Sequence, residues 1–313
     1  MEDSATLRIG SENYTFPLIK GTENETAVDL RTLRGSSGCI TFDDGYGNTG
    51  SCESKVTFID GEKGILRYRG YPIEQLAEKS NFLESAYLLL NGELPDADEL
   101  SQFRNKIASN AGLRENMSKA FGSFAPDAHP MAVLSAMVNN LGTYHPDKST
   151  NVKNKDLAVF DETAAILIST IRTIAARDYR ARKGLAPIDP DSSLGYCADF
   201  LQMTFGDSKD PKPPPKKVSD ALNLVFLLHA DHEQNCSTST CRMVASGGAN
   251  PFASVSAAIG ALWGPLHGGA NMAVIKMLKE IHEQPETAEL WVSRHLSNNL
   301  SSDKPVALPF EDS

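Results

Sequence analysis

The sequence predicts a mainly α-helical protein with a short N-terminal β region. The first 70 residues contain short segments rich in β-branched and aromatic residues, separated by glycine-containing turns. From about Pro72 onward, apolar residues recur at the three- and four-residue spacing of helices. With 313 residues, of which 41% are hydrophobic, the chain is long enough and apolar enough to bury a full core.

Three short segments predict the β region. Tyr14–Ile19, Cys39–Phe42 and Lys55–Ile59 have the composition of strands. The turn sequence Asp60-Gly61-Glu62-Lys63-Gly64 follows the third segment. We therefore divide the chain into a β-rich segment over residues 1–70, a helical domain over residues 71–281 and a final segment over residues 282–313.

The helices are predicted from apolar spacing and from their end signals. One helix ends at Asn91-Gly92, because glycine readily adopts the left-handed conformation of a helix C-terminus. Another begins at Pro130, since proline fits the first helical turn. The stretch Lys209–Lys217 is predicted to be an exposed connection, because its prolines cannot sit inside a helix. Further helices are predicted over residues 163–179, 219–230, 251–263 and 271–281.

Two of these predicted helices have distinctive compositions. Ser219–Ala230 is apolar almost all round, so we expect it inside a large helical body. Pro251–Trp263 is rich in alanine, serine and glycine, whose small side chains allow neighbouring helices to approach closely. Histidines of interest stand at the end of the first stretch and shortly after the second, which places them at helix ends.

Charge and cysteine content restrict the class of protein. The formal net charge of −10 argues against binding to nucleic acid or to anionic membrane surfaces. The five cysteines are odd in number and form no Cys-x-x-Cys pair, so we expect reduced thiols in a cytosol-like compartment. No signal-like N-terminus or bilayer-length apolar run occurs, and we predict a cytoplasmic protein.

His229 and His232 lie at the end of the apolar stretch 219–230, and they share one helix face if the helix continues. They fit three interpretations. In the first, they are hydrogen-bonded structural histidines. In the second, they bind a metal together with Asp231 and Glu233. In the third, they bind an anionic substrate at the helix end. The spacing lacks the i,i+4 histidine pair of the common helical zinc signature.

His267 stands between a broken helix and a starting one, in the sequence Trp263–Asn271. The positive potential at a helix N-terminus favours its neutral form, which can donate a hydrogen bond to a developing enolate oxygen. Gly268 and Gly269 leave space for another molecule to approach the backbone. The alternative is that the two glycines only form a tight turn.

Three long motifs stand in order in the second half of the chain: His-Ala-Asp-His-Glu-Gln-Asn-Cys-Ser-Thr-Ser-Thr (229–240), Ser-Gly-Gly-Ala-Asn-Pro-Phe (246–252) and Leu-Trp-Gly-Pro-Leu-His-Gly-Gly-Ala-Asn (262–271). Four shorter motifs precede them: Cys-Glu-Ser-Lys-Val-Thr-Phe-Ile-Asp-Gly (52–61), Arg-Gly-Tyr-Pro-Ile (69–73), Leu-Leu-Asn-Gly-Glu-Leu-Pro (89–95) and His129-Pro130-Met131. Together they resemble the bacterial-type (type II) branch of the citrate synthase family, collinearly from about residue 7 to residue 281.

The resemblance implies the large helical domain of a citrate synthase, with the small domain mostly missing from this sequence. It implies condensation of acetyl-CoA with oxaloacetate to give citrate and CoA, without a cofactor or a metal. By similarity, His267 is the catalytic residue that hydrogen-bonds the acetyl carbonyl, and Ser237 is placed to orient it. The residues implied to bind or shape the oxaloacetate pocket are His232, His229 and Asn235. Supporting positions are Gly268, Gly269 and Asn271.

The second half of the family's active site is not found in the sequence. Citrate synthases carry a Gly-Phe-Gly-His-Arg motif after the position of His267, followed by an aspartate base and carboxylate-binding arginines. Here only His282 and His295 follow, neither in that context, and Asp303 and Asp312 lack the family context. We therefore expect a C-terminally truncated chain with impaired activity, and the tail suggests a frameshift, altered splicing or gene decay.

Alternative functions remain open at this point. A 2-methylcitrate synthase uses propionyl-CoA, and the motifs do not separate it from a citrate synthase. A non-catalytic subunit would pair with a full-length copy through large-domain helices, so we expect a homo-oligomer. Some bacterial-type members are inhibited by NADH through an Arg-His pair, and the corresponding positions here read Ser109-Asn110, which argues against that control.

Overall fold

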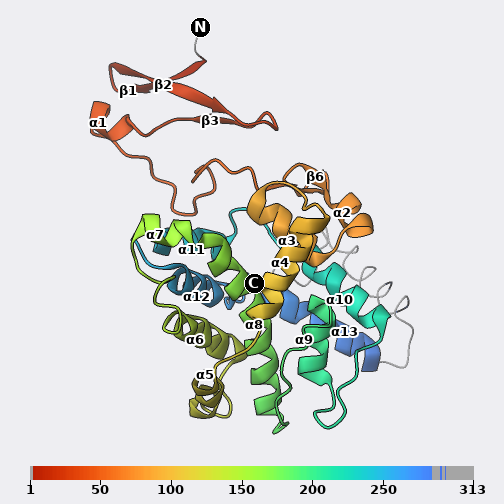
Figure 1. The fold of residues 1–313 in the computed structure, drawn as a ribbon. Helices are drawn as coiled ribbons and strands as arrows, with labels where there is room; N and C mark the ends of the chain where they lie inside the picture. Colours follow the sequence, from red (N-terminus) through yellow and green to blue (C-terminus); the bar gives the residue numbers. More distant parts are fainter. Residues whose placement is uncertain (1–2, 284–289, 291–292, 294–313) are drawn as a thin grey trace. The chain divides into compact units, whose positions relative to one another are not determined.

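The computed structural model describes residues 3–283, Leu290 and Ser293. The prediction of a mainly α-helical fold is confirmed, because helices dominate and the sheets are small. The chain divides into two compact units, Met1–Lys55 and Val56–Ser313 (Figure 1). The predicted tail over residues 282–313, including His295, Asp303 and Asp312, lies almost entirely outside the described residues.

The first unit is a three-stranded antiparallel sheet in the order β1-β2-β3. The predicted strand Tyr14–Ile19 lies within β2, where Phe16 is buried. The predicted strand Cys39–Phe42 is wrong, because these residues are irregular and Phe42 is 91% exposed. A strand-like composition needs a neighbouring edge to pair with, and this segment forms no ladder with the described strands. The elements are β1 (Ser4–Ile9), β2 (Glu12–Lys20), β3 (Thr26–Val28) and α1 (Leu33–Ser37).

The second unit begins with a small antiparallel sheet of β4 (Thr57–Asp60), β5 (Ile65–Tyr68) and β6 (Tyr71–Pro72). The ring of Tyr68 is fully buried, in a cluster with Leu88 of α3 (Phe82–Asn91) and Leu227 of α10 (Lys216–Leu228). These strands therefore pack with the helices that follow them. The boundary between the units consequently lies at Lys55, upstream of the boundary at residue 70 that the strand pattern suggests.

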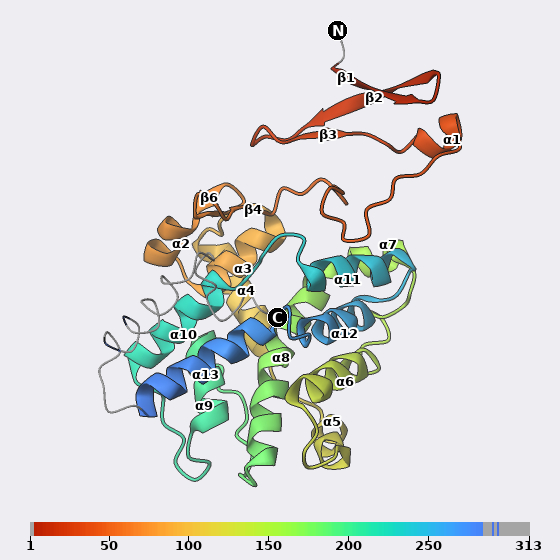
Figure 2. The same cartoon turned by 180° about the vertical axis from the view of Figure 1, so that it is seen from behind.

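Helix α8 (Phe160–Arg182) runs through the middle of the helical unit. None of the described helices is long and apolar enough to cross a membrane. Figures 1 and 2 show α6, α11 and α12 on one side of it, and α9 and α10 on the other. The remaining helices are α2 (Ile73–Lys79), α4 (Ala97–Ser109), α5 (Glu115–Lys119), η1 (Ala120–Ser123), α6 (Pro130–Gly142), α7 (Lys153–Ala158), α9 (Tyr196–Phe205), α11 (Cys236–Ser246), α12 (Pro251–Leu262) and α13 (Gly269–Glu283).

Small residues bring α6 and α12 close together. Ser135 Oγ donates to Ser256 O, and Ser256 Oγ donates to Ser135 O, each over 2.8 Å. A Cβ added to Gly142 would lie 3.0 Å from Cβ of the fully buried Phe252. The close approach expected from the composition of residues 251–263 is therefore present.

Helix α10 is less buried than its composition predicts. Only Leu227 is buried, while Val218 and Val225 are 47% and 48% exposed. One side of the helix packs on α2, α3 and α9, and these described neighbours leave its other apolar side uncovered. An apolar sequence predicts burial only where a neighbour is present to provide it.

Candidate active site

The loop between α10 and α11 carries the first two histidines. Helix α10 ends at Leu228, so His229 is its C-cap residue, and Nδ1 of His229 lies 2.8 Å from Val225 O. The helix does not continue to His232, and the two histidines therefore do not share one helix face. The broken helix instead leaves both imidazoles exposed to solvent.

Asn235 fixes the end of this loop. It is the N-cap of α11, and its Oδ1 accepts hydrogen bonds from Ser237 N at 2.9 Å and Thr238 N at 3.1 Å. Its Nδ2 donates to His232 O at 3.3 Å. One amide side chain therefore connects the backbone of His232 to the first turn of the helix that carries Ser237.

The tight turn before α13 explains why residue 268 is a glycine. Gly268 N donates to Leu262 O at 3.0 Å, and a Cβ at Gly268 would lie only 2.2 Å from that oxygen. Gly268 is therefore required by the chain's own tight turn. A Cβ at Gly269 would meet Pro265 Cβ at 3.5 Å, an ordinary contact. Asn271 N closes the turn by donating to Gly268 O at 3.2 Å.

The side chains of Ser237 and His267 meet across the α11–α12 region. Ser237 Oγ lies 2.8 Å from Nε2 of the half-buried His267 and 3.0 Å from Ala258 O, a carbonyl of α12. The hydroxyl has one proton, and it donates that proton to only one of these acceptors at a time. If the hydroxyl donates to Nε2, the neutral imidazole carries its proton on Nδ1.

An aromatic contact holds the other end of the turn that carries His267. The rings of His129 and Trp263 stack with centroids 4.7 Å apart. His129 is the N-cap of α6, and its Nδ1 accepts a hydrogen bond from Met131 N at 3.2 Å. The sequence motifs predicted no role for His129 beyond its place in the family motif. A histidine directly before the proline that starts a helix is the signal that points to this cap.

The predicted site residues thus fall on two connected segments. The loop with His229 and His232 leads into Asn235 and Ser237, and Ser237 contacts His267. Within the part of the chain that the structure describes, no group of three or more His, Cys, Asp or Glu side chains is arranged to hold a metal ion. The geometry is that of one imidazole held by a hydroxyl of α11, with two exposed imidazoles on the loop that leads into that helix.

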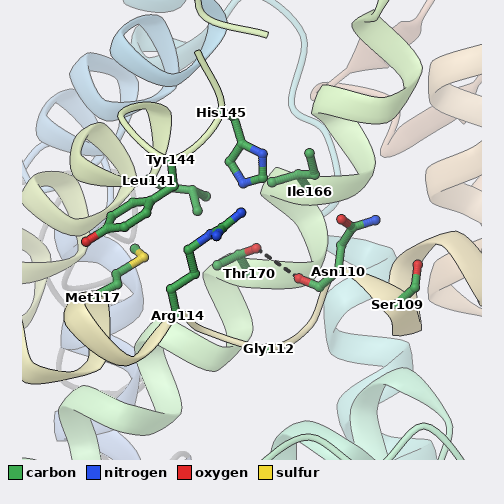
Figure 3. Close-up of a pocket in the computed structure, with 10 residues that line it drawn as sticks. All are labelled: Ser109, Asn110, Gly112, Arg114, Met117, Leu141, Tyr144, His145, Ile166 and Thr170. Carbon is green, nitrogen blue, oxygen red and sulfur yellow. Dashed lines mark hydrogen bonds between the residues drawn. The ribbon is translucent and has the colours of Figure 1, made fainter. Parts of the chain in front are cut away.

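A separate cavity of about 170 Å³ contains none of these residues (Figure 3). Arg114 and His145 point into it, and the Arg114 guanidinium lies 5.9 Å from the centre of the Tyr144 ring. Burial lowers the pKa of His145, and the charge of Lys148 lowers it further. The lining residues are Ser109, Asn110, Gly112, Arg114, Met117, Leu141, Tyr144, His145, Ile166 and Thr170.

The sequence matches known proteins over nearly its whole length. The family profile described as "Citrate synthase, C-terminal domain" matches residues 45–304. Citrate synthase 1 of Mycobacterium tuberculosis, from strains CDC 1551 and H37Rv, is 44% identical over 293 residues, which are 94% of this chain and 67% of that protein. The chain belongs to the citrate synthase family. The profile match continues beyond residue 281, where the resemblance carried by the motifs ends.

Solved citrate synthases share the fold of this family member. The enzyme from Pyrobaculum aerophilum has a TM-score of 0.70 and 32% identity, over 85% of this chain and 62% of that one. The enzyme from Thermotoga maritima has a TM-score of 0.65 and 31% identity, over 82% and 65% of the two chains. The enzyme from Thermoplasma acidophilum, in a ternary complex with carboxymethyl coenzyme A and oxaloacetate, has a TM-score of 0.69 and 28% identity, over 80% and 63%. This chain therefore spans about two thirds of the length of these citrate synthases.

Proposed function

We propose that this chain carries the acetyl-enolising half of a citrate synthase site, for the reaction of acetyl-CoA with oxaloacetate. The observation that carries the proposal is the contact of Ser237 Oγ with His267 Nε2 at 2.8 Å. It supplies a preorganised imidazole in a family whose chemistry requires a donor for an enolate oxygen. No cofactor takes part in this proposal, since acetyl-CoA is itself a substrate.

The proton position on His267 decides its role. A thioester methyl group is a weak acid, so its enolate forms only where a donor meets the developing oxyanion. When Ser237 donates to Nε2, Nδ1 of a neutral His267 supplies that donor. When Ser237 donates to Ala258 O instead, Nδ1 carries the lone pair and supplies none. The proposal therefore requires the first arrangement during the reaction.

We assign oxaloacetate to the exposed imidazoles of His232 and His229, with Asn235 holding the loop. The solved relative from Thermoplasma acidophilum binds oxaloacetate together with a coenzyme A analogue, which supports this substrate pair. Because the chain has a formal net charge of −10, a dianion needs local donors to overcome general repulsion.

A cytoplasmic location belongs to the same proposal and is supported by the five free cysteines.

We further propose that the 313 residues alone turn over slowly. The sequence after His267 contains no Gly-Phe-Gly-His-Arg motif, and a missing base or carboxylate clamp costs orders of magnitude in rate. Thiol release from acetyl-CoA with oxaloacetate, measured on purified protein, tests the proposal. A second arm with propionyl-CoA tests the alternative of a 2-methylcitrate synthase, which requires the faster release in that arm.

A second candidate function is a non-catalytic partner for another copy of the enzyme. Helix α13 exposes Met272, Ile275 and Leu278, which are 65%, 54% and 50% accessible and recur every three residues. Such a stripe on a helix is typical of a surface that another chain covers. Sedimentation velocity tests it. Self-association supports a homo-oligomer, while a soluble monomer with a sharp two-state melt counts against it.

A further inference from the structure

We propose that Glu233 is a positioning residue, which anchors the loop of His229 and His232 to the β4–β5 hairpin and thereby sets the imidazole of His232 for its ligand. The inference rests on the proposed role of these histidines in binding oxaloacetate. It concerns a residue that the sequence pattern assigned only to a possible metal site.

The backbone of Glu233 has an unusual conformation. Its φ is +53°, in the left-handed region that residues other than glycine and asparagine rarely adopt. A residue remains in such a conformation only where its surroundings determine it, and these positions are common at functional sites. The local determinant is a turn in which Glu233 N donates to Asp231 Oδ2 at 3.0 Å.

The side chain of Glu233 makes a contact over a long sequence separation. Its Oε1 accepts a hydrogen bond from Ile59 N at 2.6 Å, across 174 positions. Ile59 lies in β4, so the carboxylate binds the backbone of the hairpin. A charged acceptor on an amide gives a stronger hydrogen bond than a neutral one. This contact connects the histidine loop directly to the sheet.

Tyr68 holds the other side of the same loop. Its fully buried hydroxyl lies 3.2 Å from Leu227 O and 3.2 Å from Asp231 O, and burial raises its pKa, so it stays a protonated donor. Asp231 and Glu233 are the two neighbours of His232. The hairpin therefore fixes the backbone on both sides of an imidazole that itself remains exposed.

An exposed imidazole on a restrained backbone suits ligand binding. A binding side chain loses less conformational freedom when its backbone is already fixed, and small displacements of a contacting group weaken binding strongly. A purely structural role would instead require only that Glu233 contributes to stability. The two roles predict different ligand affinities for variants that remove the hydrogen bond of Glu233 to Ile59 N, once with its left-handed backbone strain relieved and once with the strain kept.

Three substitutions make that separation. Glu233→Gly removes the carboxylate and relieves the left-handed strain, so the melting temperature stays near the wild-type value. Glu233→Ala removes the carboxylate and keeps the strain, so the melting temperature falls. Glu233→Gln keeps an acceptor oxygen for Ile59 N. Glu62→Gly is the matched control, because Glu62 is an exposed glutamate in the turn of the same hairpin.

The test is calorimetric titration of the full chain with oxaloacetate, together with hydrogen exchange of the Ile59 amide and of residues 229–235. We expect the Kd to rise about tenfold or more in the Gly and Ala variants, against about twofold or less in the Gln and Glu62 variants. Wild-type affinity in Glu233→Gly overturns the inference.

The same experiment separates this inference from the proposed function. If the wild-type chain does not bind oxaloacetate at all, the proposed function fails. The positioning role is then decided by exchange alone. Faster exchange of residues 229–235 in Glu233→Gly, with wild-type rates in Glu233→Gln, supports it, and unchanged rates overturn it.

Discussion

Ser237 Oγ lies 2.8 Å from Nε2 of His267, and the same oxygen lies 3.0 Å from Ala258 O. One hydroxyl proton therefore faces two acceptors, and its direction determines which nitrogen of His267 is protonated. The pair links α11 to the turn before α13. It also makes the tautomer of a single imidazole the property on which the proposed chemistry depends.

The tautomer of His267 is expected to respond to Ser237. In Ser237→Ala, the imidazole loses its partner at Nε2, so the Nδ1-protonated form becomes less populated and residual thiol release falls about 10- to 100-fold. Nitrogen-15 chemical shifts of His267 report the tautomer directly. Ser237→Thr keeps a hydroxyl and serves as the control. An unchanged tautomer in the alanine variant would show that Ser237 does not orient His267.

The two glycines after His267 are expected to differ in stability effect. Gly268→Ala places a Cβ 2.2 Å from Leu262 O and destabilises the chain by about 2–3 kcal/mol. Gly269→Ala makes only ordinary contacts and changes stability by about 0.5 kcal/mol or less. Chemical denaturation of both variants measures the difference. Equal effects would contradict the tight-turn explanation.

The packing of α6 on α12 gives a second matched pair. Gly142→Ala forces a Cβ to 3.0 Å from Phe252 Cβ, in a fully buried position, and is expected to cost about 1–3 kcal/mol. Gly260→Ala in α12 meets nothing within 4 Å and is expected to stabilise by about 0.5–1 kcal/mol, because alanine favours helix. Thermal unfolding of both variants checks the opposite signs. Loss of stability at Gly260 would count against the described helix surface.

The half-buried imidazole of His145 predicts a pH dependence of stability. Burial lowers its pKa below 6.5 in the folded state, with a further contribution from the charge of Lys148. As pH falls through 6.5, the unfolded chain takes up the proton first, so stability decreases from that point downward. His145→Gln should lose less stability than wild type between pH 7.5 and pH 5.5, measured by denaturant unfolding. Parallel losses would exclude this contribution from His145.

Local patterns predicted where helices begin and end better than they predicted which side chains are buried. The proline at residue 130 and the glycine at residue 92 mark a helix start and a helix end where the structure has them. The strand predicted at Cys39–Phe42 and the burial predicted for α10 were wrong, because both depend on neighbours that a local pattern does not contain. The Glu233–Ile59 contact was not predictable, since it forms across 174 positions.

In the candidate site, too, the motifs predicted some features and only the structure explains the others. The motifs identified His267 and Ser237, and the resemblance to citrate synthases implied their proximity. The position of His232 off the helix and the reason for Gly268 needed the backbone path. The absence of NADH control stays a prediction, although Ser109 and Asn110 do line the cavity of Figure 3.

We propose that His267 supplies the acetyl-enolising half of a citrate synthase site in this chain. Thiol release from acetyl-CoA with oxaloacetate under single-turnover conditions, with the purified protein in excess, tests it most directly. We predict slow release by the wild-type chain, which falls to the uncatalysed rate in His267→Ala and persists in the Glu62→Gly control. Release that does not depend on His267 would exclude this role of the imidazole, and rapid multiple turnover by the 313 residues alone would exclude the proposed half-site.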